Sequence, residues 1–351
     1  MTTAVVALSM LATACGASPD SSEEAASSSE ASELTVVMWG GEDQQVTVDA
    51  LVMPWAEERG VEIRQDSPSD YAKIRAQVES DRVTWGAVEV EPNFAVTACE
   101  NGWATPLDFD VIDVSAIDPQ FVNDCAVPIL EYAFTIAYNT DKYPTGQHPT
   151  SWAEFFDTEA FPGKRGFWRY ATGAMFEAAL LADGVAPDDL YPLDIDRAFA
   201  KLDTIKDDIV FYDTGQEQVQ LVSSGEVPLI QAWNGRIFEA AQAGQPVANE
   251  WNEHLLSYDH VIIPNGYPHT DLAQEWMNWF LNSPEAQADY ANASAYAPVN
   301  DAAMEFVEPH VGDELPTSAA NAAKRAAVMD YSYWAEHYDP VSERMNEWMA
   351  G

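Results

Sequence analysis

Basic residues are scarce in this sequence: 16 Lys and Arg stand against 58 Asp and Glu among 351 residues, a formal net charge of -42. Proteins that bind nucleic acid meet the phosphate backbone with clustered cations, so this imbalance excludes nucleic acid as a partner. Most of the acidic side chains are interpreted as a solvated surface that maintains solubility. The same negative field would draw cationic solutes toward the protein.

Signature motifs of common enzyme classes are also missing. The sequence has no phosphate-binding loop, no dinucleotide glycine fingerprint, no Gly-x-Ser-x-Gly elbow and no paired metal-binding histidines. We therefore expect a protein that is not an enzyme and that uses no cofactor or metal. Carboxylate pairs suited to glycosidic cleavage fit so acidic a composition, so an exported glycan hydrolase stays open as an alternative.

Long apolar runs are absent after the N-terminus, because no later segment has the roughly 20 apolar residues that span a bilayer. Residues 1–15 are uncharged and mostly apolar and end in Cys15, a pattern typical of a lipoprotein export signal in which that Cys carries the lipid. Residues 16–33 are rich in Ser, Ala and Glu and predict a flexible tether. We expect an extracytoplasmic protein, in the periplasm or on the outer face of the cell membrane, anchored through its lipid. An ordinary apolar strand or helix is the alternative for residues 4–12.

Cysteine is rare as well, with three residues in all. If Cys15 is acylated, Cys99 and Cys125 remain as an even pair in an oxidising compartment. One disulfide between them is the prediction, and two buried free thiols are the alternative. Bonding depends on the distance between the two residues in the fold, which their spacing along the chain does not determine.

The sequence does contain 47% hydrophobic residues and a regular alternation of short apolar runs with amphipathic stretches, which predicts a globular α/β protein. Extended runs at 131–139 and 255–264 are interpreted as two crossover strands between two lobes. Each lobe would hold a mostly parallel sheet flanked by helices, with residues 34–137 and 264–351 in lobe 1 and residues 138–263 in lobe 2. Within lobe 1, we expect strands over 34–38, 61–64 and 87–90, helices over 46–59, 71–80 and 94–101, and helices again from 270 to 351.

Sites in open α/β sheets lie at the carboxyl ends of strands, and two lobes joined by two crossings place these ends face to face across a cleft. The predicted strand ends carry aromatic, acidic and amide side chains. Because most Trp side chains are largely buried, a core role is the plain alternative for each Trp. Buried carboxylates need a cation, a basic partner or an open rim. The candidates are Trp39, Glu42, Glu89, Glu91, Asn93, Tyr212, Asp213, Trp233, Asn234 and Asp259.

Several stretches, in their order and spacing, resemble the spermidine/putrescine-binding family of ABC-importer receptors. The resemblance implies a two-lobed periplasmic-binding-protein fold whose lobes close on the ligand, with a membrane permease and its ATPase as partners. It also implies a cleft that meets ammonium groups with carboxylates and holds the methylene chain between aromatic faces. The similarity covers residues 34–305, and the stretches are Val37–Glu42, Cys99–Asp108, Ser151–Asp157, Phe161–Arg165, Leu180–Leu193, Ala232–Arg236 and Asp259–Gly266.

By this resemblance, Trp39 and Trp233 are pocket tryptophans, Asp259 anchors an amine, and Tyr296 is a late pocket tyrosine. Some positions differ from the family's pattern. The segment 170–174, which begins with Tyr170, holds no carboxylate where polyamine receptors have an acidic pair. Glu91 and Asn93 replace a Ser and a Tyr, and Glu42 replaces a Tyr. These differences would move the acidic contacts to Glu42, Glu89 and Glu91.

The expected function is that of a monomeric substrate-binding lipoprotein of an ABC transporter. Its ligand would be a polyamine such as spermidine or putrescine, or a similar organic cation, delivered to the permease. A receptor for another small solute, such as a quaternary amine, a sugar or an iron chelate, is the runner-up. Iron receptors cluster Tyr with His or carboxylate oxygens, which is not evident in this sequence. Sugar sites combine aromatic platforms with amides, and Asn234 keeps that reading open.

Overall fold

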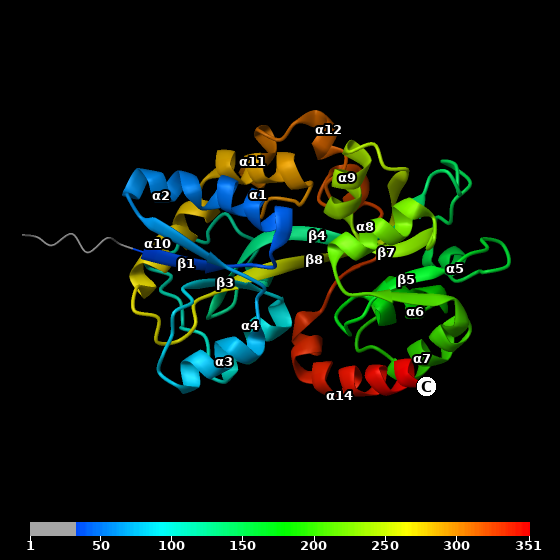
Figure 1. Ribbon diagram of the computed structural model, residues 1–351, viewed down its shortest axis with the longest axis horizontal. Coiled ribbons are helices and arrows are strands. Elements are labelled where there is room, and N and C mark those ends of the chain that lie inside the picture. The colour runs from blue at the N-terminus through cyan, green and yellow to red at the C-terminus, as the bar shows by residue number, and fades with distance from the viewer. Residues whose placement is uncertain (1–32) are drawn as a thin grey trace, which may run out of the picture. The chain divides into compact units, whose positions relative to one another are not determined.

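Two long strands, β4 (Ala126–Asn139) and β8 (Val247–Ile262), organise the fold (Figure 1). They pair with each other in antiparallel fashion along most of their length. The computed structural model describes residues 33–351, so Cys15 and the expected signal lie outside the described residues. β4 and β8 contain the two runs that the sequence predicts as crossovers. β8 starts earlier than the predicted run. The apolar pattern does not show its first half, Val247–Glu253, because these residues are largely polar and only partly buried.

The remaining strands and the helices alternate along the chain. The strands are β1 Glu33–Val37, β2 Glu62–Asp66, β3 Ala87–Val90, β5 Arg165–Trp168, β6 Ile209–Tyr212, β7 Leu229–Trp233 and β9 Ala327–Val328. The helices of the first 250 residues are α1 Gly41–Leu51, α2 Met53–Arg59, α3 Tyr71–Glu79, α4 Pro92–Glu100, α5 Trp152–Phe155, α6 Met175–Ala182, α7 Ile195–Asp203, α8 Gly215–Ser224 and α9 Asn234–Gln242. The later helices are α10 Thr270–Leu281, α11 Pro284–Ser294, α12 Pro309–Gly312, α13 Ala319–Ala322 and α14 Tyr331–Ala350.

A nine-stranded sheet connects both halves, in the order β2-β1-β3-β8-β4-β7-β5-β6, with β9 paired to β8. The strands β1, β2 and β3 are parallel to one another, and so are β5, β6 and β7. We call β1–β3 with α1–α4 and α10–α11 the first lobe, and β5–β7 with α5–α9 the second lobe. This is the two-lobed α/β architecture expected from the sequence, and the crossover strands join the two parallel sets into one sheet.

The register shows where the parallel strands point. The last residue of β3, Val90, lies opposite His260 of β8. The last residue of β7, Trp233, lies opposite Phe134 of β4, which in turn pairs with Leu255 of β8. The carboxyl ends of β3 and β7 therefore approach the middle of the same crossover pair from opposite sides. Side chains that follow these strands meet between the lobes.

The helix predicted over 46–59 is wrong as a single element. The structure has α1 and α2, separated at Val52, whose φ of -119° and ψ of -53° depart from an ideal helix. Pro54 explains the break, because proline has no N–H to donate to the preceding turn and its ring clashes with the carbonyl four residues earlier. Pro54 instead occupies the first turn of α2, where a missing N–H costs nothing.

The C-terminal helix α14 contacts both lobes. It packs against α4 of the first lobe. On the second lobe, Trp334 Nε1 donates a 2.9 Å hydrogen bond to Glu177 Oε1 of α6, and Trp348 Nε1 donates one of 2.7 Å to Asp203 Oδ1 of α7. The chain reaches α14 through β9, which interrupts the helices expected from 270 to 351. A third segment thus passes between the lobes beside β4 and β8.

Candidate ligand-binding site

Trp39 and Asp259 meet between the lobes although they are 220 residues apart in the chain. Trp39 follows β1, and its indole Nε1 donates a 2.8 Å hydrogen bond to Asp259 Oδ2 in β8. The Trp39 side chain is 36% exposed, whereas Asp259 is buried. The second carboxylate oxygen of Asp259, Oδ1, is buried and has no hydrogen-bond partner among the described residues. It is an acceptor beside the indole N–H of Trp39.

The carboxyl group of Glu89 lies next to that of Asp259. Glu89 lies opposite Val261, two residues from Asp259 on the neighbouring strand, so both carboxyls project from the same face of the sheet. Burial raises the pKa of Asp259 to about 8, although the Trp39 hydrogen bond acts in the opposite direction. Burial, and then the adjacent Asp259 charge, raise the pKa of Glu89 well above its usual range. The pair therefore resists carrying two negative charges at neutral pH.

Glu91 connects the two lobes. It follows β3, and Thr172 of the second lobe donates a 2.7 Å hydrogen bond from Oγ1 to Glu91 Oε1. Tyr71 of α3 donates from its hydroxyl to Glu91 Oε2 at 3.3 Å and accepts from the Glu91 backbone N–H at 3.0 Å. Burial raises the pKa of Glu91, and the bonds from Thr172 and Tyr71 offset part of that rise. The bond from Thr172 indicates that the structure represents a closed arrangement of the lobes.

A second contact between the lobes joins charges of opposite sign. Arg236 of α9 lies 3.3 Å from Asp43 of α1, measured between Nη2 and Oδ2, and 3.6 Å from Glu239. Burial raises the pKa of Asp43, and the Arg236 charge opposes that rise. Neither residue was among the sequence candidates. Their neighbours were, since Arg236 ends the segment Ala232–Arg236 and Asp43 follows Glu42.

The start of α9 is held in place by Asn234 and Gly235. Asn234 Oδ1 accepts a 2.9 Å hydrogen bond from Ala133 N of β4, and its Nδ2 donates one of 2.8 Å to Ala295 O. A Cβ on Gly235 would lie 2.6 Å from Cε1 of Tyr296 and 2.5 Å from Ser294 O, so only glycine fits there. These contacts set the direction in which Arg236 leaves the helix. Asn234 therefore has a structural role.

Aromatic side chains cluster at the strand ends of the second lobe. The ring centroids of Trp233 and Trp168, which end β7 and β5, lie 5.0 Å apart. Tyr170 stacks at a tilt on Trp168 at 4.8 Å and is 44% exposed, so it lies at the rim. Tyr212 packs edge-on beneath Trp233 at 5.7 Å. Trp233 contacts these rings and Phe134, while Trp39 is bonded to Asp259 of the crossover strand β8.

The remaining candidates differ from one another in exposure and in their contacts. Glu42 is exposed in the first turn of α1. Asn93 is buried in the first turn of α4, and its Oδ1 lacks a hydrogen-bond partner among the described residues. Tyr296 is buried against Gly235 and meets Tyr132 edge-on at 6.0 Å. Cys99 and Cys125 are joined by a disulfide with their Cα atoms 5.6 Å apart, which links the end of α4 to the start of β4.

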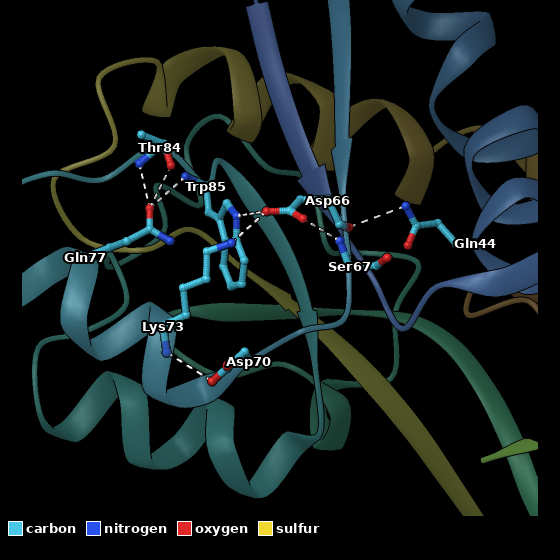
Figure 2. A network of polar contacts seen from close by, with 8 residues as sticks. All are labelled: Gln44, Asp66, Ser67, Asp70, Lys73, Gln77, Thr84 and Trp85. Carbon is cyan, nitrogen blue, oxygen red and sulfur yellow. Dashed lines mark hydrogen bonds and ion pairs between the residues drawn. The ribbon is translucent and has the colours of Figure 1, made fainter.

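Asp66, at the end of β2, is another strand-end carboxylate, and it is used inside the first lobe (Figure 2). Its Oδ2 accepts hydrogen bonds of 2.8 Å from Lys73 Nζ and from Trp85 Nε1, and its Oδ1 accepts one of 2.9 Å from Ser67 N. The bond from Lys73, followed by that from Trp85, holds the pKa of Asp66 below its usual range. Asp66 thus ties β2 to α3 and to the segment before β3, with its acceptors already occupied.

The two-lobed fold and the polar cluster between the lobes define a solute-binding protein. The chain belongs to the family described as bacterial extracellular solute-binding protein, whose model matches residues 50–323. It is 31% identical over 333 residues to the gamma-aminobutyric acid-binding protein of Pseudomonas aeruginosa, covering 93% of each chain. It is 26% identical over 212 residues to the spermidine/putrescine-binding periplasmic protein of Escherichia coli, covering 59% of this chain and 58% of that protein.

A solved structure of a solute-binding protein has the same fold. The structure of the Atu4243 GABA receptor superposes with a TM-score of 0.84 and 40% sequence identity, covering 90% of this chain and 97% of that one. The protein is thus an extracytoplasmic solute-binding protein of an ABC importer, a class that delivers small solutes to the permease and is not enzymatic.

Among residues 33–351, no helix combines the length and apolar character of a membrane span. Over the same residues, no group of three or more His, Cys, Asp or Glu is placed to hold a metal ion.

Proposed function

We propose that the ligand is a small molecule with a primary ammonium group at one end and a carboxylate at the other, in the class of γ-aminobutyrate. The observation that carries the proposal is the buried Oδ1 of Asp259, an acceptor with no partner among the described residues. A ligand ammonium would donate to this oxygen and lie against the face of Trp39. Such a cation gains about 0.5 to 2 kcal/mol from the ring, in addition to the charge-assisted hydrogen bond.

Arg236 supports the carboxylate end of the proposed ligand. Its guanidinium is partly buried beside Asp43, and its charge also acts on Glu89. A planar guanidinium presents paired N–H donors that match a carboxylate. Arg236 therefore suits a ligand carboxylate better than it suits a ligand ammonium. A ligand with both charges would place opposite ends toward Asp259 and Arg236. The relatives named for γ-aminobutyrate support the same class.

A polyamine is the second candidate, as the sequence suggested. The cluster holds four carboxyl groups, those of Asp43, Glu89, Glu91 and Asp259, and the Arg236 charge acts on Asp43 and Glu89. A diamine would place its second ammonium near Asp43 or Glu91, where it would repel Arg236. The spermidine/putrescine-binding relative supports this reading over a shorter stretch of the chain.

Isothermal titration calorimetry with two ligands of similar length separates the candidates. γ-Aminobutyrate and putrescine share the ammonium and differ at the other end. We expect γ-aminobutyrate to bind and putrescine to bind at least tenfold more weakly. Tighter binding of putrescine would overturn the proposal in favour of the polyamine.

Two variants test the two ends. Asp259→Asn should weaken γ-aminobutyrate about 100-fold, because truncating one partner of a buried charge pair costs about 2 to 5 kcal/mol. Arg236→Gln should weaken γ-aminobutyrate but leave putrescine unchanged or tighter. Glu57→Gln, at an exposed position of α2, is the control and should bind like the wild type. If Arg236→Gln leaves γ-aminobutyrate affinity unchanged, the assignment of the carboxylate end is wrong.

We also propose that Cys15 carries a lipid, that the protein is a monomer, and that residues 34–137 with 264–351 and residues 138–263 form the two lobes. Mass spectrometry of the mature N-terminus tests the lipid: an unmodified Cys15 would exclude it. Light scattering tests the monomer.

A further inference from the structure

Glu89 and Asp259 form a buried acid pair on adjacent antiparallel strands. Glu89 pairs with Val261, and Asp259 lies two residues away on the same face of β8. Both side chains are buried. One oxygen of Asp259 accepts from Trp39, and the other has no donor among the described residues except a proton carried by the neighbouring Glu89. Two carboxyls in such a position cannot both ionise at low cost, because burial and mutual repulsion both favour a proton on one of them.

The charged groups around the pair add to this effect. Asp43 of α1 and Glu91 at the end of β3 bring further negative charge. Arg236 of α9 is the positive group that acts on Glu89, and it is already paired with Asp43 and Glu239.

Phenols face the pair from the other elements. They belong to Tyr71 of α3, Tyr132 of β4, Tyr290 of α11, Tyr296 after α11 and Tyr331 of α14. Burial is the largest cause that raises the pKa of each, so all five remain neutral at pH 7. They therefore supply no positive charge.

We propose that Glu89 and Asp259 hold one shared proton in the ligand-free cleft, that a primary ammonium group of the ligand replaces it, and that the pair thereby selects cations that carry N–H. The inference rests on the proposed function for the presence of an ammonium group in the ligand. Before binding, Glu89 is the carboxylic acid and Asp259 the carboxylate. On binding, the proton of Glu89 passes to solvent buffer. The ligand stays protonated and donates N–H bonds to both carboxylates.

The selection of N–H follows from the oxygens. Trp39 satisfies Oδ2 of Asp259, so the ligand must satisfy Oδ1 and the newly ionised Glu89. A primary ammonium has three donors for these acceptors. A trimethylammonium group has the same charge and none, so it would leave buried carboxylate oxygens unpaired. The pair therefore discriminates between ligands of equal charge.

Calorimetry in buffers of different ionisation enthalpy tests the exchange. With γ-aminobutyrate at pH 7 in phosphate, HEPES and Tris, we expect release of about one proton per ligand bound, and a Kd that falls about tenfold per pH unit from pH 6 to 7. Glu89→Gln keeps a neutral side chain of the same shape and should abolish both the release and the pH dependence. The trimethylated analogue of γ-aminobutyrate should bind at least 50-fold more weakly to the wild type.

Controls separate this inference from the proposed function. Glu177→Gln removes another buried acid, away from the cleft, and should retain the proton release. If putrescine binds instead of γ-aminobutyrate and releases a proton, the carboxylate end is wrong and the exchange stands. Carbon-13 NMR of the ligand-free protein requires no ligand: among the carboxyl signals that titrate above pH 6 in the wild type, one should be absent from Glu89→Gln. If Glu89→Gln removes no signal that titrates above pH 6, or if binding releases no proton, the exchange is wrong.

Discussion

Thr172 Oγ1 donates a 2.7 Å hydrogen bond to Glu91 Oε1, and this bond joins the second lobe to the first. It replaces a contact with water that Glu91 would make if the lobes separated. A hydrogen bond to a charged group contributes about 1.5 to 3 kcal/mol, so its loss should shift the balance between open and closed lobes.

Thr172→Val keeps the shape of the side chain and removes the hydroxyl. We expect the Kd for the ligand to rise about tenfold, because the closed state loses the bond while Glu91 stays buried. Calorimetry measures the affinity, and small-angle X-ray scattering measures the closed fraction. Thr172→Ser, which retains the hydroxyl, should behave like the wild type. Equal affinities for the Val and Ser variants would show that the bond does not stabilise closure.

Gly235→Ala should destabilise the protein and displace Tyr296. The added Cβ would lie 2.5 Å from Ser294 O and 2.6 Å from Cε1 of Tyr296, and the backbone oxygen cannot move freely. Overpacking of this kind costs about 1 to 3 kcal/mol, measurable by denaturant unfolding. Gly312→Ala is the matched control, because the nearest atom to its Cβ is 3.9 Å away. A Gly235→Ala protein as stable as the control would contradict the predicted clash.

Glu177→Gln should flatten the dependence of stability on pH. Burial raises the pKa of Glu177 to about 7 from its usual 4.5, although hydrogen bonds from Tyr191 and Trp334 lower it in part. A folded pKa above the unfolded one stabilises the native state at low pH, and this stabilisation is lost as pH rises from 4.5 through 7. The loss amounts to roughly 3 kcal/mol.

The measurement is guanidinium unfolding at pH 5 and pH 8. The wild type should lose more stability between these values than Glu177→Gln does, because glutamine keeps the acceptor for Trp334 and does not ionise. Other buried acids, such as Glu131 with a pKa of about 8, contribute equally to both proteins and cancel in the comparison. Parallel pH curves for the two proteins would contradict the assignment.

Added salt should raise the melting temperature. A formal net charge of -42 destabilises the folded state through self-repulsion, which salt screens. The Debye length falls from about 10 Å at 0.1 M to about 3 Å at 1 M, so the gain should occur mainly below 1 M KCl. Differential scanning fluorimetry at increasing KCl measures it. A melting temperature that is flat or falls over this range would show that repulsion does not limit stability.

Much of the fold could be predicted from local patterns. The short, mainly apolar runs at 34–38 and 87–90 correspond to β1 and β3, because strands inside a parallel set are covered by helices and carry mostly apolar residues. The first half of β8 could not be predicted in this way. Its polar residues pair with β4 only because the crossover strand continues into the second lobe, which is a tertiary constraint.

The site also has residues that the sequence predicts and residues that only the tertiary structure brings in. Trp39 and Asp259 are predicted from strand ends, and the resemblance to a known family gives them their roles, but no periodicity connects residues 220 apart. Arg236 is not predicted from the sequence, because a cationic ligand is expected to lie among carboxylates and aromatic rings. Its signal was present in the sequence as a basic residue directly after Trp233-Asn234-Gly235. The structure adds its partner, Asp43, from the other lobe.

The sequence by itself determined the alternation of strands and helices, the acidic excess and the family to which the chain belongs, because these depend on composition, periodicity and motif order. Only the tertiary structure decided that Glu89 and Asp259 lie buried together, beside Trp39 and within the influence of one arginine. The physical reason is that a carboxyl group's charge depends on its solvation and its neighbours. Both are set by the packing of β3 against β8 and by the approach of the second lobe.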